Sequence, residues 1–212
     1  MPIVFFDIET TGLDHAAHEI CQIAAVAIGK GWVERDALEV KLHFDDDAAD
    51  PQSLQMNSYD PQVWEKHAVS PEVGIQQFSS FLQRHAEVPK VSRRGKPYKV
   101  AQLAGHNIAT FDMLFVRRAF KTHNLFLPAE FLGLDTLQLA AWWRQFQNAA
   151  GQPPENLKLS TLSNIFGIDH DDAHDALADV RANVLVAKAM IKTLGLDRAS
   201  MLPSSGGGKR SR

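Results

Sequence analysis

The stretch that decides the fold is residues 3–13, which read IVFFDIETTGL. Its first part, Ile3–Ile8, is dense in β-branched and aromatic side chains, and residues 10–12 then begin a turn. This composition is typical of a strand that is buried on both faces. We therefore expect the strand to lie in the middle of a sheet. Two acids, Asp7 and Glu9, interrupt its apolar run and need an explanation.

Two further apolar segments follow at short distances. Residues 20–28 form a second apolar run that is closed by a Gly-Lys-Gly turn, and residues 38–44 alternate apolar with polar side chains. The alternation predicts a half-exposed strand. We expect the three strands to form an antiparallel meander, followed by an acidic turn over residues 45–51.

The second half of the chain alternates helical and extended patterns. We expect strands at 100–104 and 131–134, with helices after Pro71 and over 110–122, 137–142, 159–166 and 175–194. Antiparallel strands followed by this alternation predict one α/β domain with a mixed sheet, over residues 1–196. Residues 197–212, which are rich in Gly and Ser, are expected to form a flexible tail.

One segment, residues 88–99, breaks this alternation. It carries five bases and no acid, together with two prolines and a glycine. It predicts a basic loop or hairpin inserted into the domain. Such a segment either tracks the phosphates of a nucleic acid or is an ordinary solvated loop.

Composition excludes several classes of protein. The 212 residues include one cysteine, Cys21, so neither an intrachain disulfide nor a multi-cysteine zinc site can form. We expect a reducing, cytoplasmic compartment, no signal peptide and no membrane span. The net charge of −3 argues by itself against a nucleic-acid partner. The distribution of charge removes this objection to a nucleic-acid partner. Basic residues gather at 88–99 and 117–121, whereas the acidic residues gather elsewhere.

The paired acids of the first strand share one face, because residues two apart on a strand point the same way, roughly 7 Å apart. Two buried carboxylates of like charge repel, and no cation in the strand offsets them. Either Asp7 and Glu9 bind metal, or they lie at the exposed end of the strand and accept hydrogen bonds from turn amides.

Two more acids occur where a helix begins. Asp112 ends the segment GHNIATFD, residues 105–112, and Asp179 follows His174 by five residues. Acids in first helical turns are also common for structural reasons, and a lone histidine is more often a surface residue. Together, the four carboxylates suit a pair of Mg²⁺ or Mn²⁺ ions, and a neutral imidazole suits deprotonation of water. The chemistry indicated is metal-assisted hydrolysis of a phosphodiester.

These motifs resemble, in order, the three motifs of the DnaQ-like, DEDDh branch of the 3′-to-5′ exonucleases. Residues 4–13 are similar to the first motif, 105–112 to the second, and His174 with Asp179 to the third. The resemblance spans about residues 3–192. One departure lies at residues 56–58, Met-Asn-Ser, where many members carry His-Gly-Ile.

The resemblance implies an RNase H-like fold with a five-stranded mixed sheet. It also implies two Mg²⁺ ions, replaceable by Mn²⁺, held by Asp7, Glu9, Asp112 and Asp179. His174 would be the general base. The terminal nucleotide would be contacted by Thr10, Thr11, Leu13 and Asn107.

The implied activity is removal of nucleoside 5′-monophosphates from a DNA or RNA strand with a free 3′ end. We expect DNA to be slightly favoured over RNA, with a role in proofreading or repair, alone or beside a polymerase. Three alternatives stay open: an exoribonuclease that trims RNA 3′ ends, a non-catalytic nucleic-acid-binding module, and an endonuclease on the same architecture.

Overall fold

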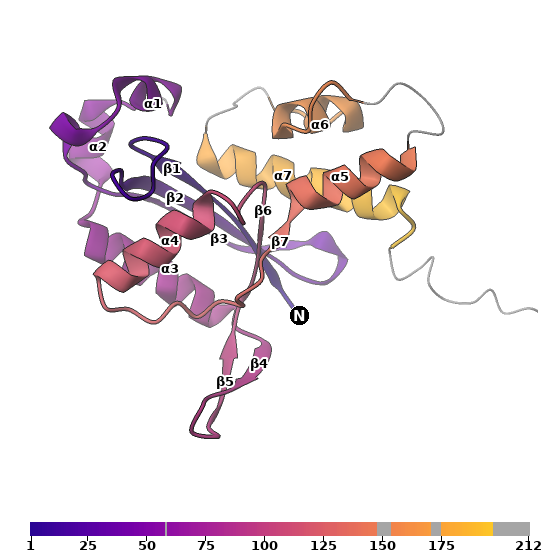
Figure 1. Ribbon diagram of the computed structural model, residues 1–212, viewed down its shortest axis with the longest axis horizontal. Helices are drawn as coiled ribbons and strands as arrows, with labels where there is room; N and C mark the ends of the chain where they lie inside the picture. Colours follow the sequence, from indigo (N-terminus) through magenta and orange to yellow (C-terminus); the bar gives the residue numbers. More distant parts are fainter. Residues whose placement is uncertain (58, 148–153, 171–174, 197–212) are drawn as a thin grey trace, which may run out of the picture.

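The computed structural model describes residues 1–57, 59–147, 154–170 and 175–196 (Figure 1). Its centre is a five-stranded sheet of order β3-β2-β1-β6-β7. The strands are β1 (Ile3–Thr10), β2 (Ile20–Ile28), β3 (Glu34–Lys41), β6 (Gln102–Gly105) and β7 (Leu134–Asp135). β1 pairs antiparallel with β2 and parallel with β6. The predicted central strand and the five-stranded mixed sheet are therefore confirmed.

Helices cover both faces of this sheet (Figure 1). Their bounds are α1 (Pro51–Met56), α2 (Pro61–His67), α3 (Pro71–Arg84), α4 (Asp112–Thr122), α5 (Thr136–Gln147), α6 (Leu159–Phe166) and α7 (Ala176–Thr193). α3 and α4 pack on one face and α7 on the other. α5 and α6 pack against α7.

The central strands are buried on both sides because their alternate residues serve two cores. Phe6 and Ile8 of β1 face α3 and α4, and the Phe6 ring lies 5.8 Å from that of Phe78. Phe5 faces the opposite way and packs with Val180 and other apolar residues of α7. β2 is buried along its whole length. These two strands consequently form a rigid support for any side chain at their ends.

The structure corrects three details of the predicted elements. β3 begins at Glu34 and ends at Lys41, and the next residue, Leu42, bridges Val69 while its backbone N–H still donates to the Cys21 carbonyl of β2 at 2.8 Å. The region after the acidic turn holds the helices α1 and α2, which the apolar periodicity did not predict. The strand expected at 131–134 is reduced to Leu134–Asp135, and the residues before it form a coil beside β6.

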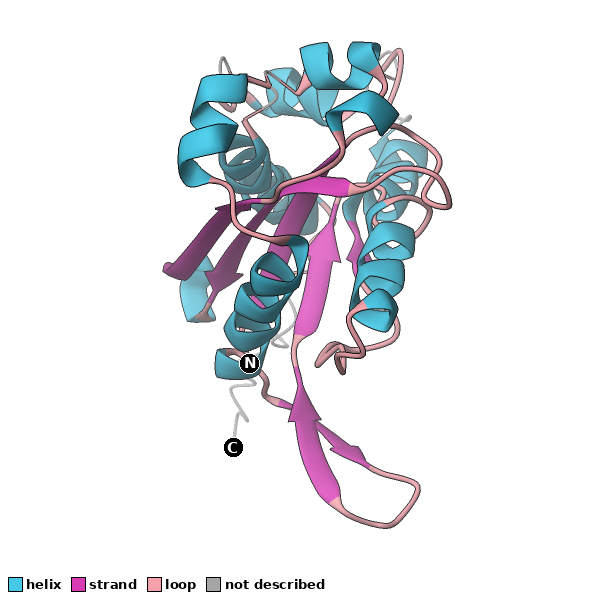
Figure 2. Cartoon of the chain, turned by 90° about the vertical axis from the view of Figure 1, so that its left-hand side faces the viewer, coloured by secondary structure: helices cyan, strands magenta, loops and turns pink. Residues whose placement is uncertain are grey.

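The basic segment forms a separate antiparallel hairpin of β4 (Val88–Val91) and β5 (Pro97–Val100). It projects from the end of the sheet at which β6 begins (Figures 1 and 2). The hairpin alternative is thus the correct one. In the described ranges, no helix combines the length and the apolar character needed to cross a membrane.

Candidate active site

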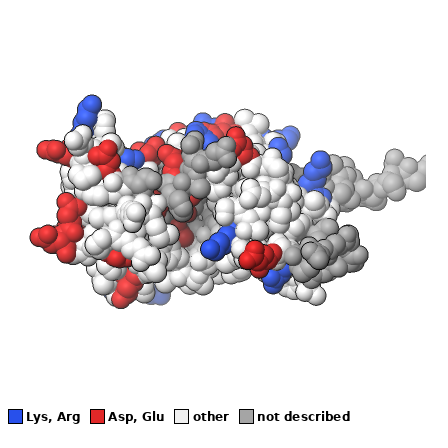
Figure 3. All heavy atoms as spheres, turned by 90° about the horizontal axis from the view of Figure 1, so that it is seen from above, with Lys and Arg blue, Asp and Glu red and all other residues white. Residues whose placement is uncertain are grey.

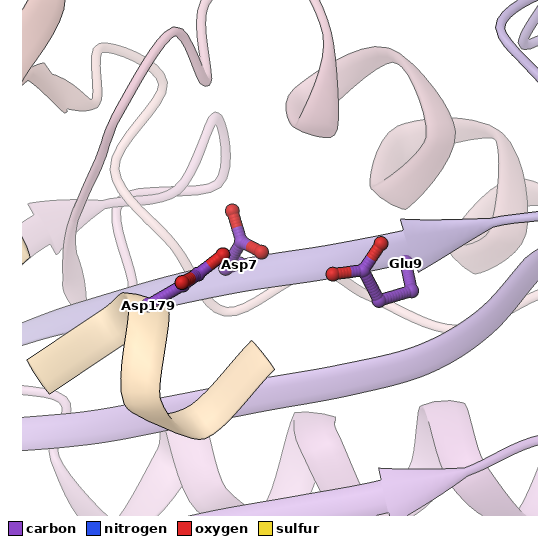
Figure 4. Close-up of side chains that lie close together, drawn as sticks. All are labelled: Asp7, Glu9 and Asp179. Carbon is purple, nitrogen blue, oxygen red and sulfur yellow. The ribbon is translucent and has the colours of Figure 1, made fainter. Parts of the chain in front are cut away.

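Three of the predicted acids meet at the carboxyl end of β1 (Figure 4). The strand pleat places Asp7 and Glu9 on the same side as Phe5, which is the side covered by α7. α7 packs its Ala176 and Val180 on the sheet, and Asp179 in its first turn therefore faces β1. Carboxylate oxygens of the three acids all lie within 4.8 Å of one another.

The fourth acid, Asp112, approaches from the opposite face. It is the first residue of α4 and is 3% exposed, and its Oδ1 accepts the backbone N–H of Ile8 at 3.2 Å. β6, which leads to the loop before α4, ends close to β1, since a Cβ on its last residue, Gly105, would lie 2.7 Å from the Phe6 carbonyl oxygen. Asp112 therefore approaches the acidic cluster from the face of the sheet that α4 covers.

Burial is the main cause of raised pKa values at three of these acids, Asp7, Glu9 and Asp112. The pKa of Asp7 lies well above its ordinary value, first because of burial and then because of the three neighbouring acids. Burial, reinforced by Asp179 and Asp112, raises the pKa of Glu9 to about 8. Burial also raises the pKa of Asp112 to about 7. Without a bound cation, the cluster retains protons near neutral pH.

The histidine nearest the described acids is one that sequence reasoning missed. The Nε2 atom of His170 is hydrogen-bonded to Oδ1 of Asp179, and the His170 side chain is 7% exposed. The predicted general base, His174, lies outside the described residues. Among the residues that the structure describes, His170 is the only basic side chain paired with any of the four acids.

The residues expected to meet the substrate differ in exposure. Thr10 and Thr11 are 5% and 3% exposed, and their hydroxyls are used locally. Thr10 Oγ1 donates to the Gly12 carbonyl at 2.8 Å, whereas Thr11 Oγ1 accepts from Glu19 N–H at 3.0 Å. Their side chains shape the turn. Leu13 is 80% exposed beside them and is free to touch a ligand.

The segment that departs from the family pattern supports this turn. Asn57, the C-cap of α1, donates from Nδ2 to the Thr10 carbonyl at 2.8 Å. The backbone N–H of Asp50 donates to the Thr11 carbonyl, also at 2.8 Å. Both ends of α1 therefore hold the chain that leaves the catalytic strand.

The loop after β6 is held by an acid outside the cluster, Asp135. Asp135 accepts from the backbone N–H groups of Asn107, Ala109 and Leu137, at 3.1, 3.0 and 2.9 Å. Asn107 adopts a left-handed backbone with φ of 65°, and its Oδ1 accepts from Thr110 Oγ1 at 2.6 Å. Asp135 is thus a structural acid rather than a member of the cluster.

The donor set fits hard divalent cations. Four carboxylates converge without a neutralising Lys or Arg in the described ranges, and oxygen ligands are those that Mg²⁺ and Mn²⁺ prefer. Asp7, Glu9 and Asp179 offer oxygens close enough to share an ion, and Asp112 stands behind them. Figure 3 shows acidic atoms within a hollow near the middle of the face above β1.

Comparisons with known proteins agree with this geometry. The exonuclease family RNase_T matches residues 4–94. Oligoribonuclease of Mycobacterium tuberculosis is 26% identical over 185 residues, which cover 84% of this chain and 78% of that protein. Protein NEN3 of Arabidopsis thaliana is 36% identical over 94 residues, 44% of this chain and 17% of NEN3.

Among solved structures, E. coli Exonuclease I in complex with a dT13 oligonucleotide superposes with a TM-score of 0.72 at 22% identity. The alignment covers 91% of this chain and 41% of Exonuclease I. The chain therefore spans less than half of Exonuclease I and less than a fifth of NEN3.

The sheet order and the acidic cluster at the end of its central strand define an α/β protein with the RNase H-like fold and a cluster of acids that could hold a metal ion. Within this class, the chain is similar to the RNase_T exonuclease family over residues 4–94 and to an oligoribonuclease over 84% of its length.

Proposed function

We propose that this protein is a metal-dependent 3′-to-5′ exonuclease. The observation that carries the proposal is the meeting of Asp7, Glu9 and Asp179 within 4.8 Å, with Asp112 bound to the same strand. A non-catalytic module on this fold has no need for such a cluster, because like charges at this spacing destabilise the folded chain. Burial and, after it, repulsion by the neighbouring acids raise the pKa values of Asp7 and Glu9, in agreement with this cost.

The acids would hold two Mg²⁺ or Mn²⁺ ions. Bound divalent cations neutralise the charge that develops on a phosphodiester and favour ionisation of water at neutral pH. The chain itself supplies the rest. Asp112 is kept in place by Ile8, His174 accepts the proton of the attacking water, and the turn at Thr10–Leu13 receives the terminal nucleotide.

For the substrate, we propose a single strand with a free 3′ end, with DNA slightly favoured. The support for DNA is the likeness in fold to Exonuclease I, which is bound to an oligonucleotide of thymidines. RNA is the second candidate, because the M. tuberculosis relative that aligns with 84% of this chain is an oligoribonuclease.

The test uses matched 5′-labelled DNA and RNA 20-mers with Mn²⁺ or Mg²⁺. We expect a ladder that shortens from the 3′ end, and we expect EDTA, Asp7→Ala or His174→Ala to abolish it. Glu65→Ala removes an exposed acid of α2 and should leave the ladder unchanged. The ratio of initial rates on the two 20-mers measures the preference for DNA.

Other outcomes would identify the alternatives. Cleavage of a circular single strand would identify an endonuclease. Binding of both oligonucleotides without turnover in Mn²⁺ would identify a binding module and refute the proposed activity.

A further inference from the structure

The β4–β5 hairpin lies at the end of the sheet opposite to the acids (Figures 1 and 2). β5 leads directly into the start of β6, whereas the acids lie beside the far end of β6. Residues 94–105 are mostly extended, so at about 3.3 Å per residue the tip is roughly 30 Å from Gly105. The basic side chains of the hairpin therefore do not contact a nucleotide that is bound at the acids.

The hairpin tip is an ordered turn. Gly95 N–H donates to the Ser92 carbonyl and Ser92 N–H to the Lys96 carbonyl, each at 2.9 Å. Gly95 has φ of +74°, the left-handed conformation that a turn followed by a bulge requires. The turn presents Arg93 and Arg94 at its two central positions, and both are exposed.

The hairpin keeps most of its charge unpaired. Lys90 forms an ion pair with Glu130, which anchors the hairpin to the body. The four other bases make no ion pair with an acid in the part of the chain that the structure describes, and all are exposed: Arg93, Arg94, Lys96 and Lys99. A concentration of uncompensated positive charge of this kind attracts a polyanion.

A coil connects this hairpin with the catalytic end of the sheet. Residues 126–134 run beside β5 and β6, since Ala129 bridges Ala101 in parallel and Gln102 Nε2 donates to the Leu132 carbonyl at 3.1 Å. The coil then enters β7, which pairs with the end of β6 (Figure 1). It thus forms a continuous edge along the length of the sheet.

This edge exposes aromatic rings beside the basic hairpin. Phe126 and Phe131 are 62% and 72% exposed. The Phe126 ring lies 6.0 Å from that of Tyr98 in the hairpin, and the Arg117 guanidinium stands 4.6 Å from the Phe131 ring. The one acid of the coil, Glu130, is already neutralised by Lys90.

We propose that this edge is a track that binds single-stranded nucleic acid away from the catalytic acids. The aromatic-basic track consists of the rings of Tyr98, Phe126 and Phe131 and the bases Arg93, Arg94, Lys96 and Lys99. Exposed aromatic rings beside unpaired basic side chains suit a single strand, because its nucleobases stack on rings and its phosphates bind cations. An acidic peptide would use the bases but not the rings.

The inference rests on the proposed function, because a strand whose 3′ end is at the acids would place its 5′ part on the track. At about 3.4 Å per stacked nucleotide, a distance of roughly 30 Å corresponds to about nine nucleotides. Long strands therefore gain affinity from the track, and oligonucleotides of three or four residues gain none.

The test measures binding separately from cleavage. Fluorescein-labelled dT20 and dT3 are titrated with protein in EDTA, over a series of salt concentrations, with anisotropy as the readout. The hairpin variant is Arg93→Ser, Arg94→Ser and Lys96→Ser. The matched control variant removes three exposed lysines elsewhere: Lys30→Ser, Lys188→Ser and Lys192→Ser.

We expect the hairpin variant to bind dT20 at least tenfold more weakly at low salt. The slope of log K against log[salt] should become less steep by about 2. Three phosphate contacts are lost, and each contact with a single strand contributes about 0.7 to the slope. Phe126→Leu with Phe131→Leu should weaken dT20 binding by about fivefold or more through lost stacking. Binding of dT3 should stay the same in every variant.

Three results would overturn the track: no binding of dT20 by the wild type, equal losses in the hairpin and control variants, or no loss in the hairpin variant. Cleavage of dT3 in Mn²⁺ reports on the proposed activity alone. If the protein binds dT20 through the hairpin but cleaves no oligonucleotide, the proposed activity is refuted and the proposed binding track is supported.

Discussion

The Oδ1 atom of Asp112 accepts the backbone N–H of Ile8, the residue between Asp7 and Glu9, at 3.2 Å. This contact exists because β6 ends at Gly105, so β1 runs on without a neighbouring strand on that side. The Asp112 carboxylate accepts this N–H in place of the backbone carbonyl that a neighbouring strand would supply. One hydrogen bond thus ties a helix on one face of the sheet to the acids on the other.

We therefore predict a separation of two roles at Asp112. Asp112→Asn keeps an oxygen that accepts the Ile8 N–H but removes the charge, so the fold should persist while Mn²⁺-dependent turnover falls at least about 100-fold. Asp112→Leu leaves the buried N–H unpaired and should be less stable than Asp112→Asn by about 1–3 kcal/mol. Urea unfolding of both variants in EDTA measures the difference, and equal stabilities would contradict the structural role.

A second prediction concerns the pH dependence of stability without metal. The pKa values of Glu9 and Asp112, about 8 and about 7, exceed their ordinary values of 4.5 and 3.8. The folded chain consequently binds more protons than the unfolded chain between about pH 4 and pH 8, so these acids make stability fall as pH rises through this window. Between pH 5 and 8.5 in EDTA, we expect the melting temperatures of both the wild type and Glu9→Gln to fall. The fall should be smaller for Glu9→Gln, and the difference between the two should be on the order of 5 °C.

The same experiment with Mn²⁺ supplies the control. At pH 8, Mn²⁺ should raise the melting temperature of the wild type by several degrees and that of Glu9→Gln much less, because bound metal offsets the repulsion. Glu65→Gln removes an exposed acid and should follow the wild type throughout. A wild type that becomes more stable towards pH 8 relative to Glu9→Gln would contradict the raised pKa of Glu9.

Asp7 and Glu9 show what could be predicted from the sequence. Their shared face follows from the two-residue repeat of any strand, and the apolar neighbours of β1 already place that strand inside the sheet. The approach of Asp179 was predicted through motif order, and the structure supplies its reason in the packing of Ala176 and Val180 on the sheet.

Short elements and loop contacts were beyond sequence reasoning. Asp50-Pro51 and Asp60-Pro61 carry the same cap-and-proline signal as the start of α3, at Ser70-Pro71. However, α1 buries no residue and α2 buries only Trp64, so neither helix has the apolar period by which helices are recognised. The contact of His170 with Asp179 joins side chains nine residues apart in the sequence, which no spacing rule predicts.

The two histidines before α7 lead to a third prediction. His174→Gln should lower turnover by about 100-fold or more at saturating Mn²⁺, as loss of a general base does. His170→Gln removes a partner of Asp179 and should instead raise the Mn²⁺ concentration needed for half-maximal rate, with a smaller loss at saturation. Metal titrations of both variants separate the roles. The opposite pattern would make His170 the base.

The last prediction concerns Asn57, which lies in the segment that departs from the family pattern. Its Nδ2 donates to the Thr10 carbonyl at 2.8 Å and so fixes the turn expected to receive the terminal nucleotide. Asn57→Ala loses the hydrogen bond to the Thr10 carbonyl, worth about 1 kcal/mol, and a weaker one to Cys21 Sγ, and it should raise KM for an oligonucleotide by about fivefold while kcat changes less than twofold. Gln55→Ala, which changes an exposed side chain of the same helix, is the matched control and should keep both constants. If Asn57→Ala lowered kcat and left KM unchanged, the turn would act by aligning Asp7 and Glu9, since Thr10 ends the strand that carries them.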